Sequence, residues 1–466
     1  MRQPTESHRA LVFVIGLLLL IPALLAGTAK LSRWNPKTNP PQYIAFSRPL
    51  SNDDQITHAL DRLTFGPRPG DPAAVKEIGL DTWLDGQLHP ERRSENPILL
   101  RRLAPFDSLR MSIAETYLRY PPAQKGPDNP RRLIASQLVE GKLLRAIYGN
   151  RQLEEVLVDF WYNHFNVFLN KGADHYLVPS YERDAIRPHV LGKFHDLLLA
   201  TAESPAMLFY LDNWQSVAPG ARRKRGLNEN YGRELLELHT LGVDGGYTQK
   251  DVIEVVRCFT GWTIARPKQG GSFEYNDKVH DKGRKVVLGH TIKPGGGMND
   301  GLEVLKILSR HPSTAHFIAL KLAQRFVADD PPPSLVDRMA KTFLKKHGDL
   351  REVLHTMLSS PEFWSQGAYR AKIKTPFEMV VSAVRATGAD VVSAAPLATQ
   401  IQKLGEPLYR KIEPTGYSSA NAEWTNSAGL LGRINFAAAL AHNRLPGIKV
   451  DTADELVIGS PGFQKH

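Results

Sequence analysis

Two glutamates three residues apart are this chain's first candidates for chemistry. Glu234 and Glu237 lie in the stretch 226–242, and on a helix their carboxylates would be nearly side by side. Neighbouring carboxylates raise one another's pKa, which suits a general acid that must hold a proton near neutral pH. We therefore predict that Glu234 and Glu237 are catalytic. The alternative is a solvated helix face held by ion pairs between residues four apart.

Other side chains of this stretch extend the cluster. Arg233 precedes Glu237 by four residues, close enough to pair with it, and Asn230 shares the stripe of the two glutamates. His239 falls on the apolar shoulder of the same helix. Titratable groups gathered in this way are typical of active sites, although structural ion pairs gather them too.

The stretch 226–242 is predicted to form one helix. Asn228 is a candidate N-cap, and Gly242 is a candidate stop after the last turn. Tyr231 and Leu235 are four residues apart, so they begin an apolar stripe that can face a core.

A second helix, predicted over residues 151–170, carries a stripe of amides. Asp159, Asn163, Asn166 and Asn170 follow one another at helical spacing. Because asparagine has poor helix propensity, a stripe of three needs a reason. Hydrogen bonding to a neighbouring helix and a polar ligand surface explain it equally well.

The same helix also carries Trp161 and His164 on a wide aromatic face. His164 is either a hydrogen-bonded core histidine or part of a site. We predict that this helix packs beside residues 229–241, which would bring His164 and Glu237 into one site.

Three segments together have the composition of a sugar-binding site, since residues 209–214 add aromatic rings and a carboxylate to the two helices. Aromatic rings bind sugar faces, amides and carboxylates bind hydroxyl groups, and two carboxyl groups cleave the glycosidic bond. The predicted substrate-binding residues are Trp161, Asn163, His164, Asn166, Asp212, Asn213, Trp214, Asn230, Arg233 and His239. Because glycosidase carboxyl groups stand about 5 to 9.5 Å apart, one glutamate would work with Asp159 or Asp212.

Two other classes of function remain open, and the sequence identifies no cofactor. A metal-dependent enzyme would use Glu237, His239 and His164 as ligands, with His280 and Asp281 as extras. The spacing matches neither the zinc helix with two histidines nor the di-iron bundle. The third class is a non-catalytic scaffold or binding protein of the cell envelope. A serine hydrolase is poorly supported because no Gly-x-Ser-x-Gly motif occurs.

Composition and the N-terminus indicate where the protein works. The chain has 466 residues and a net charge of +11, without the stripe of basic and aromatic residues that nucleic-acid binding requires. Residues 11–29 are uncharged and apolar after a basic start, which predicts an export signal or a membrane anchor within 1–29. We expect a periplasmic, secreted or inner-membrane-anchored protein whose partner is an envelope polysaccharide. The single cysteine, Cys258, cannot form an internal disulfide.

The predicted fold is mainly α, a single large multi-helix domain with a small β-hairpin insertion. A linker at 30–51 leads into the helical domain at 52–447, and a C-terminal tail follows at 448–466. The insertion at about 261–299 has strand-like segments at 273–275 and 285–292, which flank a predicted hairpin turn at 280–283.

Several motifs resemble an exported bacterial family known only as domain of unknown function 1800. They are HALDRLTFG at 58–66, FWYNHFN at 160–166, NENYGRELLELHTLG at 228–242, FTGW at 259–262, YRAKIKTPF at 369–377 and WTNSAGLLGRINF at 424–436. The resemblance covers roughly residues 52–447. It implies export, and it implies no particular reaction.

Overall fold

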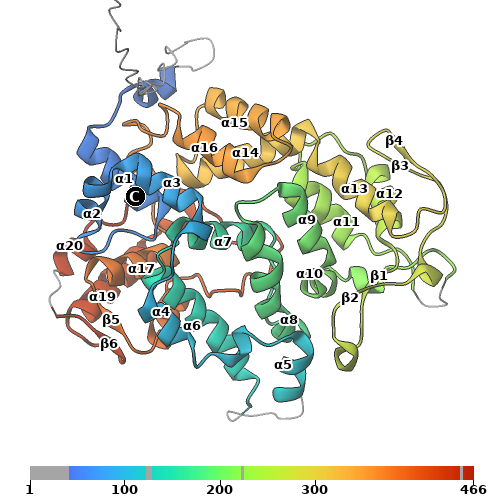
Figure 1. Cartoon of the computed structure of the whole chain (residues 1–466), viewed down its shortest axis with the longest axis horizontal. Helices are drawn as coiled ribbons and strands as arrows, with labels where there is room; N and C mark the ends of the chain where they lie inside the picture. The colour runs from blue at the N-terminus through green and yellow to red at the C-terminus, as the bar shows by residue number, and fades with distance from the viewer. Residues whose placement is uncertain (1–40, 122–128, 222–224, 452–454) are drawn as a thin grey trace, which may run out of the picture. The chain divides into compact units, whose positions relative to one another are not determined.

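The chain is mainly α-helical, as the helical spacing of its apolar residues predicts (Figure 1). The computed structural model describes residues 41–121, 129–221, 225–451 and 455–466. These residues belong to one unit, Arg33–His466. The predicted signal or anchor at 1–29 lies outside the described residues, as does the first half of the predicted linker.

The α-helices of the first half of the chain include the long helix α6. They are α1 (Asn52–Leu63), α2 (Asp71–Ile78), α3 (Leu80–Leu88), α4 (Pro97–Leu103), α5 (Ile113–Arg119), α6 (Arg132–Tyr148), α7 (Gln152–His164), α8 (Asp174–Ser180), α9 (Phe194–Glu203) and α10 (Pro205–Tyr210).

The second half adds helices from the glutamate stretch to the C-terminus. They are α11 (Asn230–Glu234), α12 (Gln249–Phe259), α13 (Asn299–Ser309), α14 (Pro312–Phe326), α15 (Pro333–Lys345), α16 (Leu350–Leu358), α17 (Pro376–Ala386), α18 (Ala395–Lys403), α19 (Ser427–Ala441) and α20 (Glu455–Gly459). Thr248, Asp349 and Thr375 cap their helices through side-chain oxygens, as their positions predict.

Short helices of other types connect these elements. The π-helices are η4 (Tyr181–Ile186) and η7 (Leu235–Thr240). The 3₁₀ turns are η1 (Pro41–Ser47), η2 (Pro90–Arg92), η3 (Asp107–Leu109), η5 (Arg187–His189), η6 (Asn213–Gln215), η8 (Pro267–Gln269), η9 (Asp277–Val279) and η10 (Asn421–Trp424).

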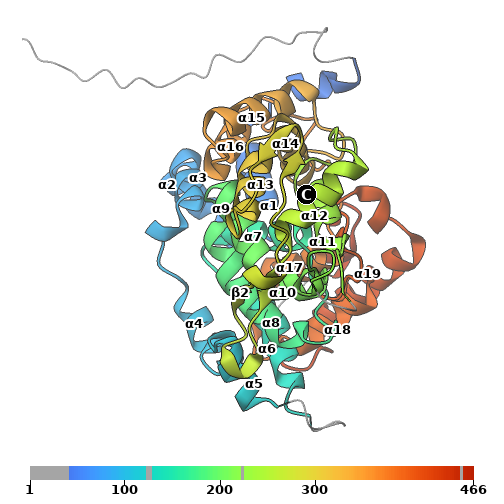
Figure 2. The same cartoon turned by 90° about the vertical axis from the view of Figure 1, so that its right-hand side faces the viewer.

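Helix α6 lies at the centre of one group of helices. It packs against α4, α7, α8, α17 and α18. Helices α14, α15 and α16 pack on one another at one end of the unit, while α5 and α8 lie together near the opposite end (Figures 1 and 2). The largest fully buried side chains include Trp161, Phe165 and Phe194, which place the helix at 152–164 in the core.

The β insertion exists, but its strands pair differently from the prediction. Strand β1 (Trp262–Ile264) pairs with β2 (Phe273–Tyr275), and β3 (Lys285–Val287) pairs with β4 (His290–Ile292). The predicted hairpin turn at 280–283 is therefore wrong. The stretch 285–292 folds on itself because Leu288 and Gly289 both adopt positive φ, as a tight hairpin turn needs.

The predicted C-terminal tail is part of the packed structure. Strand β6 (Ile448–Lys449) pairs with β5 (Asp390–Val391), and α20 packs on α19. The last residue, His466, is buried and exchanges backbone hydrogen bonds with Lys372.

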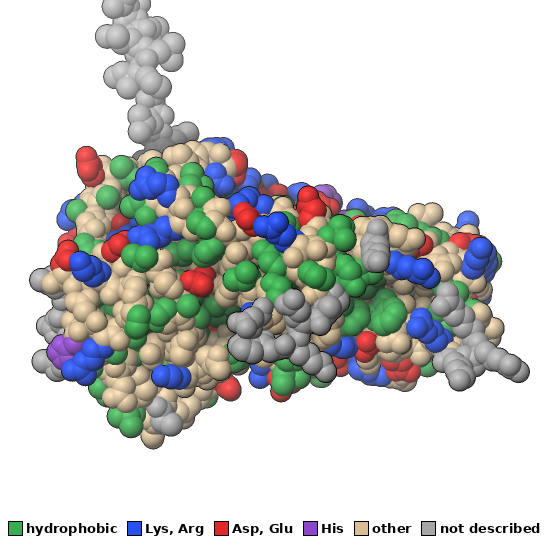
Figure 3. Space-filling model, turned by 90° about the horizontal axis from the view of Figure 1, so that it is seen from below, with side chains coloured by type: hydrophobic (Ala, Val, Ile, Leu, Met, Phe, Trp, Pro, Cys, Tyr) green, Lys and Arg blue, Asp and Glu red, His purple; other side chains and the backbone are tan. Residues whose placement is uncertain are grey.

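No helix in the described part of the chain has both the length and the apolar character to cross a membrane. On the face shown in Figure 3, Lys and Arg side chains are scattered among acidic and apolar ones and do not form a continuous stripe.

Candidate functional site

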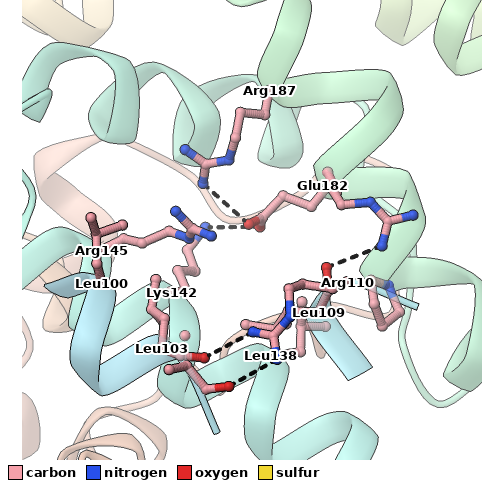
Figure 4. A pocket seen from close by; sticks show the side chains of 13 residues that line it. Leu100, Leu103, Leu109, Arg110, Leu138, Lys142, Arg145, Glu182 and Arg187 are labelled. Carbon is pink, nitrogen blue, oxygen red and sulfur yellow. Dashed lines mark hydrogen bonds and ion pairs between the residues drawn. The ribbon is translucent and has the colours of Figure 1, made fainter. Parts of the chain in front are cut away.

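A cavity of about 300 Å³ lies among α4, η3, α6, α8 and η4, and we call it the outer cavity (Figure 4). Its lining combines apolar side chains with charged ones, and most of the charged side chains are cations. The lining residues are Leu100, Leu103, Ala104, Leu109, Arg110, Leu138, Gly141, Lys142, Arg145, Pro179, Glu182, Arg183 and Arg187. None of them is among the predicted site residues.

Local backbone features shape this cavity. Pro179 lies inside α8, and the chain continues into the π-helix η4. The backbone N–H of Arg187 donates to the carbonyl of Glu182, which is the five-residue spacing of a π-turn. Such turns are frequent at functional sites. On α6, a Cβ at Gly141 would come within 2.7 Å of Leu109, so the glycine permits the close approach of η3.

The Glu182 carboxylate is the acceptor around which the charged side of the cavity is built. Lys142 Nζ lies 4.0 Å from Oε2, and Arg187 Nη2 lies 3.5 Å from Oε1. The hydroxyl of Tyr409 donates to Oε2 across 2.5 Å. Arg187 also binds Glu155 through both carboxylate oxygens, at 2.7 and 3.0 Å. Glu182 and Arg187 are thus held in place by fixed partners.

Lys142 is a permanently charged member of this group. Burial opposes its charge, but Asp159 at 2.8 Å and Glu182 outweigh burial and raise the pKa of the lysine. Its ammonium group also lies 5.1 Å from the ring centroid of Tyr409. A lysine that keeps its proton is a cation and not a nucleophile, so this geometry does not favour Schiff-base chemistry.

Lys142 also lines a second cavity, and we call it the inner cavity. At about 10 Å³ it has room for roughly one water molecule. It is lined by Lys142, Asp159, Tyr162, Asn163, Asn166, Glu406, Leu408, Tyr409 and Tyr417.

Glu406 has the most unusual acidity in the inner cavity. Burial, and then the charge of Asp159, raise the pKa of Glu406 to about 8. The backbone N–H of Phe377 donates to its Oε2 across 2.7 Å. At neutral pH Glu406 therefore holds a proton.

Arg145 differs from every other cation of the outer cavity. Its guanidinium forms no hydrogen bond or ion pair with any residue that the structure describes. Arg110, Lys142, Arg183 and Arg187 each have a carboxylate partner. Figure 4 shows the Arg145 side chain reaching toward Lys142 and Glu182.

The two predicted catalytic glutamates lie elsewhere and line neither cavity. Both are half-buried. Burial, and then the charge of Glu237, raise the pKa of Glu234, in the direction that crowding predicts. The hydroxyl of Tyr247 donates to Glu237 Oε2 across 3.3 Å.

The predicted pairing of Arg233 with Glu237 is wrong. Arg233 donates to Glu229 Oε2 and to Gln249 Oε1, both across 2.8 Å. On the N-terminal side of Arg233 the chain is a regular α-helix, which brings Glu229, four residues earlier, beside Arg233. On its C-terminal side the chain becomes the π-helix η7 at Leu235, which changes the spacing on which the prediction depended.

The helix segments that carry His164 and His239 do meet, through a hydrogen bond between His164 Nε2 and the carbonyl oxygen of His239 at 3.1 Å. Both imidazoles are buried. Burial, and then the charge of Lys321, lower the pKa of His239 to about 3, and the same causes lower the pKa of His164. His239 is directed toward Phe165, with ring centroids 5.0 Å apart. The two histidines are therefore neutral core residues.

The predicted amide stripe holds a loop in place. The helix ends at His164, so Asn166 and Asn170 do not lie on it as predicted. Asn163 Oδ1 accepts from the backbone N–H of Tyr417, and Asn166 Nδ2 donates to the carbonyl oxygens of Lys411 and Glu413. These contacts favour the structural explanation of the stripe, with the loop at 409–426 as the partner.

The remaining predicted substrate-binding residues are spread over buried and surface positions. Trp161 is fully buried, and Asn213 donates to backbone carbonyls in the core. Asp212 pairs with Lys171 at 2.9 Å. Trp214 stacks on a phenylalanine and lies under Arg225, and Asn230 is exposed.

The additional metal ligands suggested by the sequence are bound to protein groups. His280 contacts Asp300 at 3.1 Å, and Asp281 binds Arg257 at 2.8 Å. Among the residues described, no three His, Cys, Asp or Glu side chains form a group that could hold a metal ion.

The family comparison agrees with the motifs. The family described as a protein of unknown function, DUF1800, matches residues 58–463. The chain belongs to this family. No curated protein and no solved structure matches this DUF1800 chain.

Sequence reasoning did not find the outer cavity of this DUF1800 protein. Glu182 and Arg187 are five apart, a spacing that places two residues together on a π-turn and not on an α-helix. Lys142 and Arg145 are three apart on α6, which is a usable signal for a shared face. Tyr409 reaches the site from a distant loop, and no local pattern indicates it.

Proposed function

We propose that this DUF1800 protein binds a small molecule with an acidic group in the outer cavity, at Arg145. The observation that carries the proposal is the uncommitted guanidinium of Arg145 in a cavity whose other cations all have carboxylate partners. A guanidinium presents a planar fork of N–H donors that fits a carboxylate through two hydrogen bonds. A cavity of about 300 Å³ is at the lower end of the range for small-molecule sites.

The fixed surroundings of Arg145 support a binding role. Glu155 and Glu182 are already bound by Arg187, and Glu182 also by Tyr409. These contacts leave the cavity preorganised, so a ligand has little side-chain entropy to remove. Export, inferred from residues 11–29, would place this binding in the cell envelope. The proposal corresponds to the binding-protein alternative of the sequence analysis.

The test is calorimetric titration with octanoate, benzoate and glucuronate. At least one of these acids should bind to wild type, and Arg145→Met should weaken that binding tenfold or more, because a hydrogen-bonded charge pair is worth about 1.5–3 kcal/mol. Arg101→Met is the matched control, since Arg101 is an exposed arginine on α4 that does not line the cavity. Absence of binding by every acid, or equal binding by the Arg145 and Arg101 variants, would refute the proposal.

Cleavage of an envelope polysaccharide by Glu234 and Glu237 is a second candidate. Its support is the raised pKa of Glu234 beside Glu237, both at half-buried positions. A polysaccharide-degradation screen on wild type and on the two Gln variants tests it.

A further inference from the structure

The outer cavity has an apolar side and a charged side. Leu103, Leu109 and Leu138 gather on one side of Figure 4, while Arg145, Lys142, Glu182 and Arg187 meet on the other. Arg110 lies near the leucines, but its guanidinium is turned to the carbonyl oxygens of Leu103 and Ala104. Leu100 lines the cavity and is 57% exposed, so it lies toward solvent. A ligand in this space touches hydrocarbon over much of its surface.

The charges on the other side are balanced before any ligand binds. The charged groups here are three cations, Lys142, Arg145 and Arg187, and three carboxylates, Glu155, Asp159 and Glu182. Burial opposes the charge of Arg187, but Glu155 and Glu182 together outweigh burial and raise the pKa of the arginine. The donors of Lys142 and Arg187 are therefore already committed.

This balance limits the charge of the ligand. One acceptor group of a ligand can form hydrogen bonds with the free N–H donors of Arg145. A second negative group would find no unbound donor, and it would lie beside the carboxylates of Glu155 and Glu182 in a site of low dielectric, where like charges repel strongly.

We infer that the ligand is an amphiphilic monocarboxylic acid, with its carboxylate at Arg145 and an apolar body against the leucines. This inference rests on the proposed function and narrows it to one chemical class. It excludes dicarboxylates, phosphate esters and polar sugar acids as preferred ligands.

The first test compares ligands on the wild-type chain by calorimetry. Octanoate should bind at least tenfold more tightly than octanol, which lacks the charge, and than suberate, which carries a second carboxylate. It should also bind at least tenfold more tightly than octyl phosphate and glucuronate.

Equal or tighter binding of suberate or octyl phosphate would overturn the inference that the ligand carries a single charge. Equal or tighter binding of glucuronate would overturn the inference that the ligand has an apolar body. In each of these cases the proposed acid site at Arg145 would stand. Absence of binding by every acid would overturn both.

The second test changes the apolar side without touching the charges. Leu100→Ser should weaken octanoate binding threefold or more and leave the binding of acetate, measured by competition, unchanged. Leu118→Ser is the matched control, because Leu118 is also exposed, at 68%, and does not line the cavity. Equal octanoate affinity in the two variants would overturn the contact with Leu100. Because both positions are exposed, the melting temperatures of both variants should stay close to wild type.

Discussion

The phenolic hydroxyl of Tyr409 donates a hydrogen bond to Glu182 across 2.5 Å, although 227 positions separate the two residues in the chain. Glu182 lines the outer cavity and Tyr409 lines the inner one, so this bond joins the walls of both. Tyr409 has a φ of 62°, a left-handed conformation that costs a non-glycine residue about 1–2 kcal/mol. The surrounding packing must hold the tyrosine in place.

We expect Tyr409→Phe to destabilise the protein through Glu182. The change removes a donor from a buried carboxylate, which costs about 1.5–3 kcal/mol in free energy of unfolding. Urea unfolding measures the loss. Tyr417→Phe is the control, because the Tyr417 hydroxyl donates to a neutral backbone carbonyl, that of Pro407, at 2.9 Å, a bond worth about 1 kcal/mol. A loss in Tyr409→Phe no larger than in Tyr417→Phe would contradict the role given to this bond.

The helical fold and its caps follow from local sequence. The C-terminal stop at Gly242 is confirmed, with φ of 82°, because only the local pattern decides where that segment ends. The π-turn that precedes Gly242 was not predicted. In a π-turn the backbone hydrogen bond spans five residues, one more than in an α-helix. The spacing of the apolar residues Tyr231 and Leu235 does not indicate this change.

The candidate site could not be predicted in the same way. Its cations and carboxylates come from α6, α7, η4, η5 and the loop that holds Glu406 and Tyr409, and only tertiary packing brings these segments together. Two of the predicted residues illustrate the opposite difficulty. Trp161 and His239 have types that suit chemistry, but their helical position directs them into the core.

Glu406 should make stability fall as pH rises. Burial raises its folded-state pKa to about 8, whereas the unfolded chain has the ordinary value of 4.5. Between these values the folded state holds a proton that the unfolded state has lost, so stability decreases from about pH 4.5 to pH 8 and then levels off. The integrated loss is on the order of a few kcal/mol, at about 1.4 kcal/mol per pH unit.

The measurement compares urea unfolding of wild type and Glu406→Gln at pH 5 and pH 8. The wild type should lose more stability over this interval than the variant, because Gln cannot titrate. Glu423→Gln is the control, since Glu423 is exposed and should keep the wild-type dependence. The same dependence in wild type and Glu406→Gln would show that Glu406 is not the group responsible.

Glu234→Gln and Glu237→Gln test the predicted acid–base pair. Each variant should remain folded, with a melting temperature within a few degrees of wild type, because both positions are half-buried and Arg233 keeps its bonds to Glu229 and Gln249. On the catalytic hypothesis each variant loses polysaccharide turnover completely, since Gln cannot transfer a proton. Thermal melts beside an activity screen measure both. Full activity in the two variants, or their unfolding, would end the hypothesis.

Lys142 and Asp159 should behave as a coupled buried pair. Lys142→Met leaves Asp159 without its cation in a buried site, which costs about 3–5 kcal/mol. In Asp159→Asn, Lys142 keeps only the more distant carboxylate of Glu182, at 4.0 Å, so this variant should also destabilise the protein. The double variant should lose less free energy of unfolding than the sum of the two single variants. Each single change leaves one charge without its partner, and the second change removes that charge.

The control is Lys306→Met, in an exposed pair with Glu303 at 3.1 Å, which should cost no more than about 1 kcal/mol. Additive losses in the Lys142 and Asp159 cycle would mean that the ion pair does not organise the wall between the cavities.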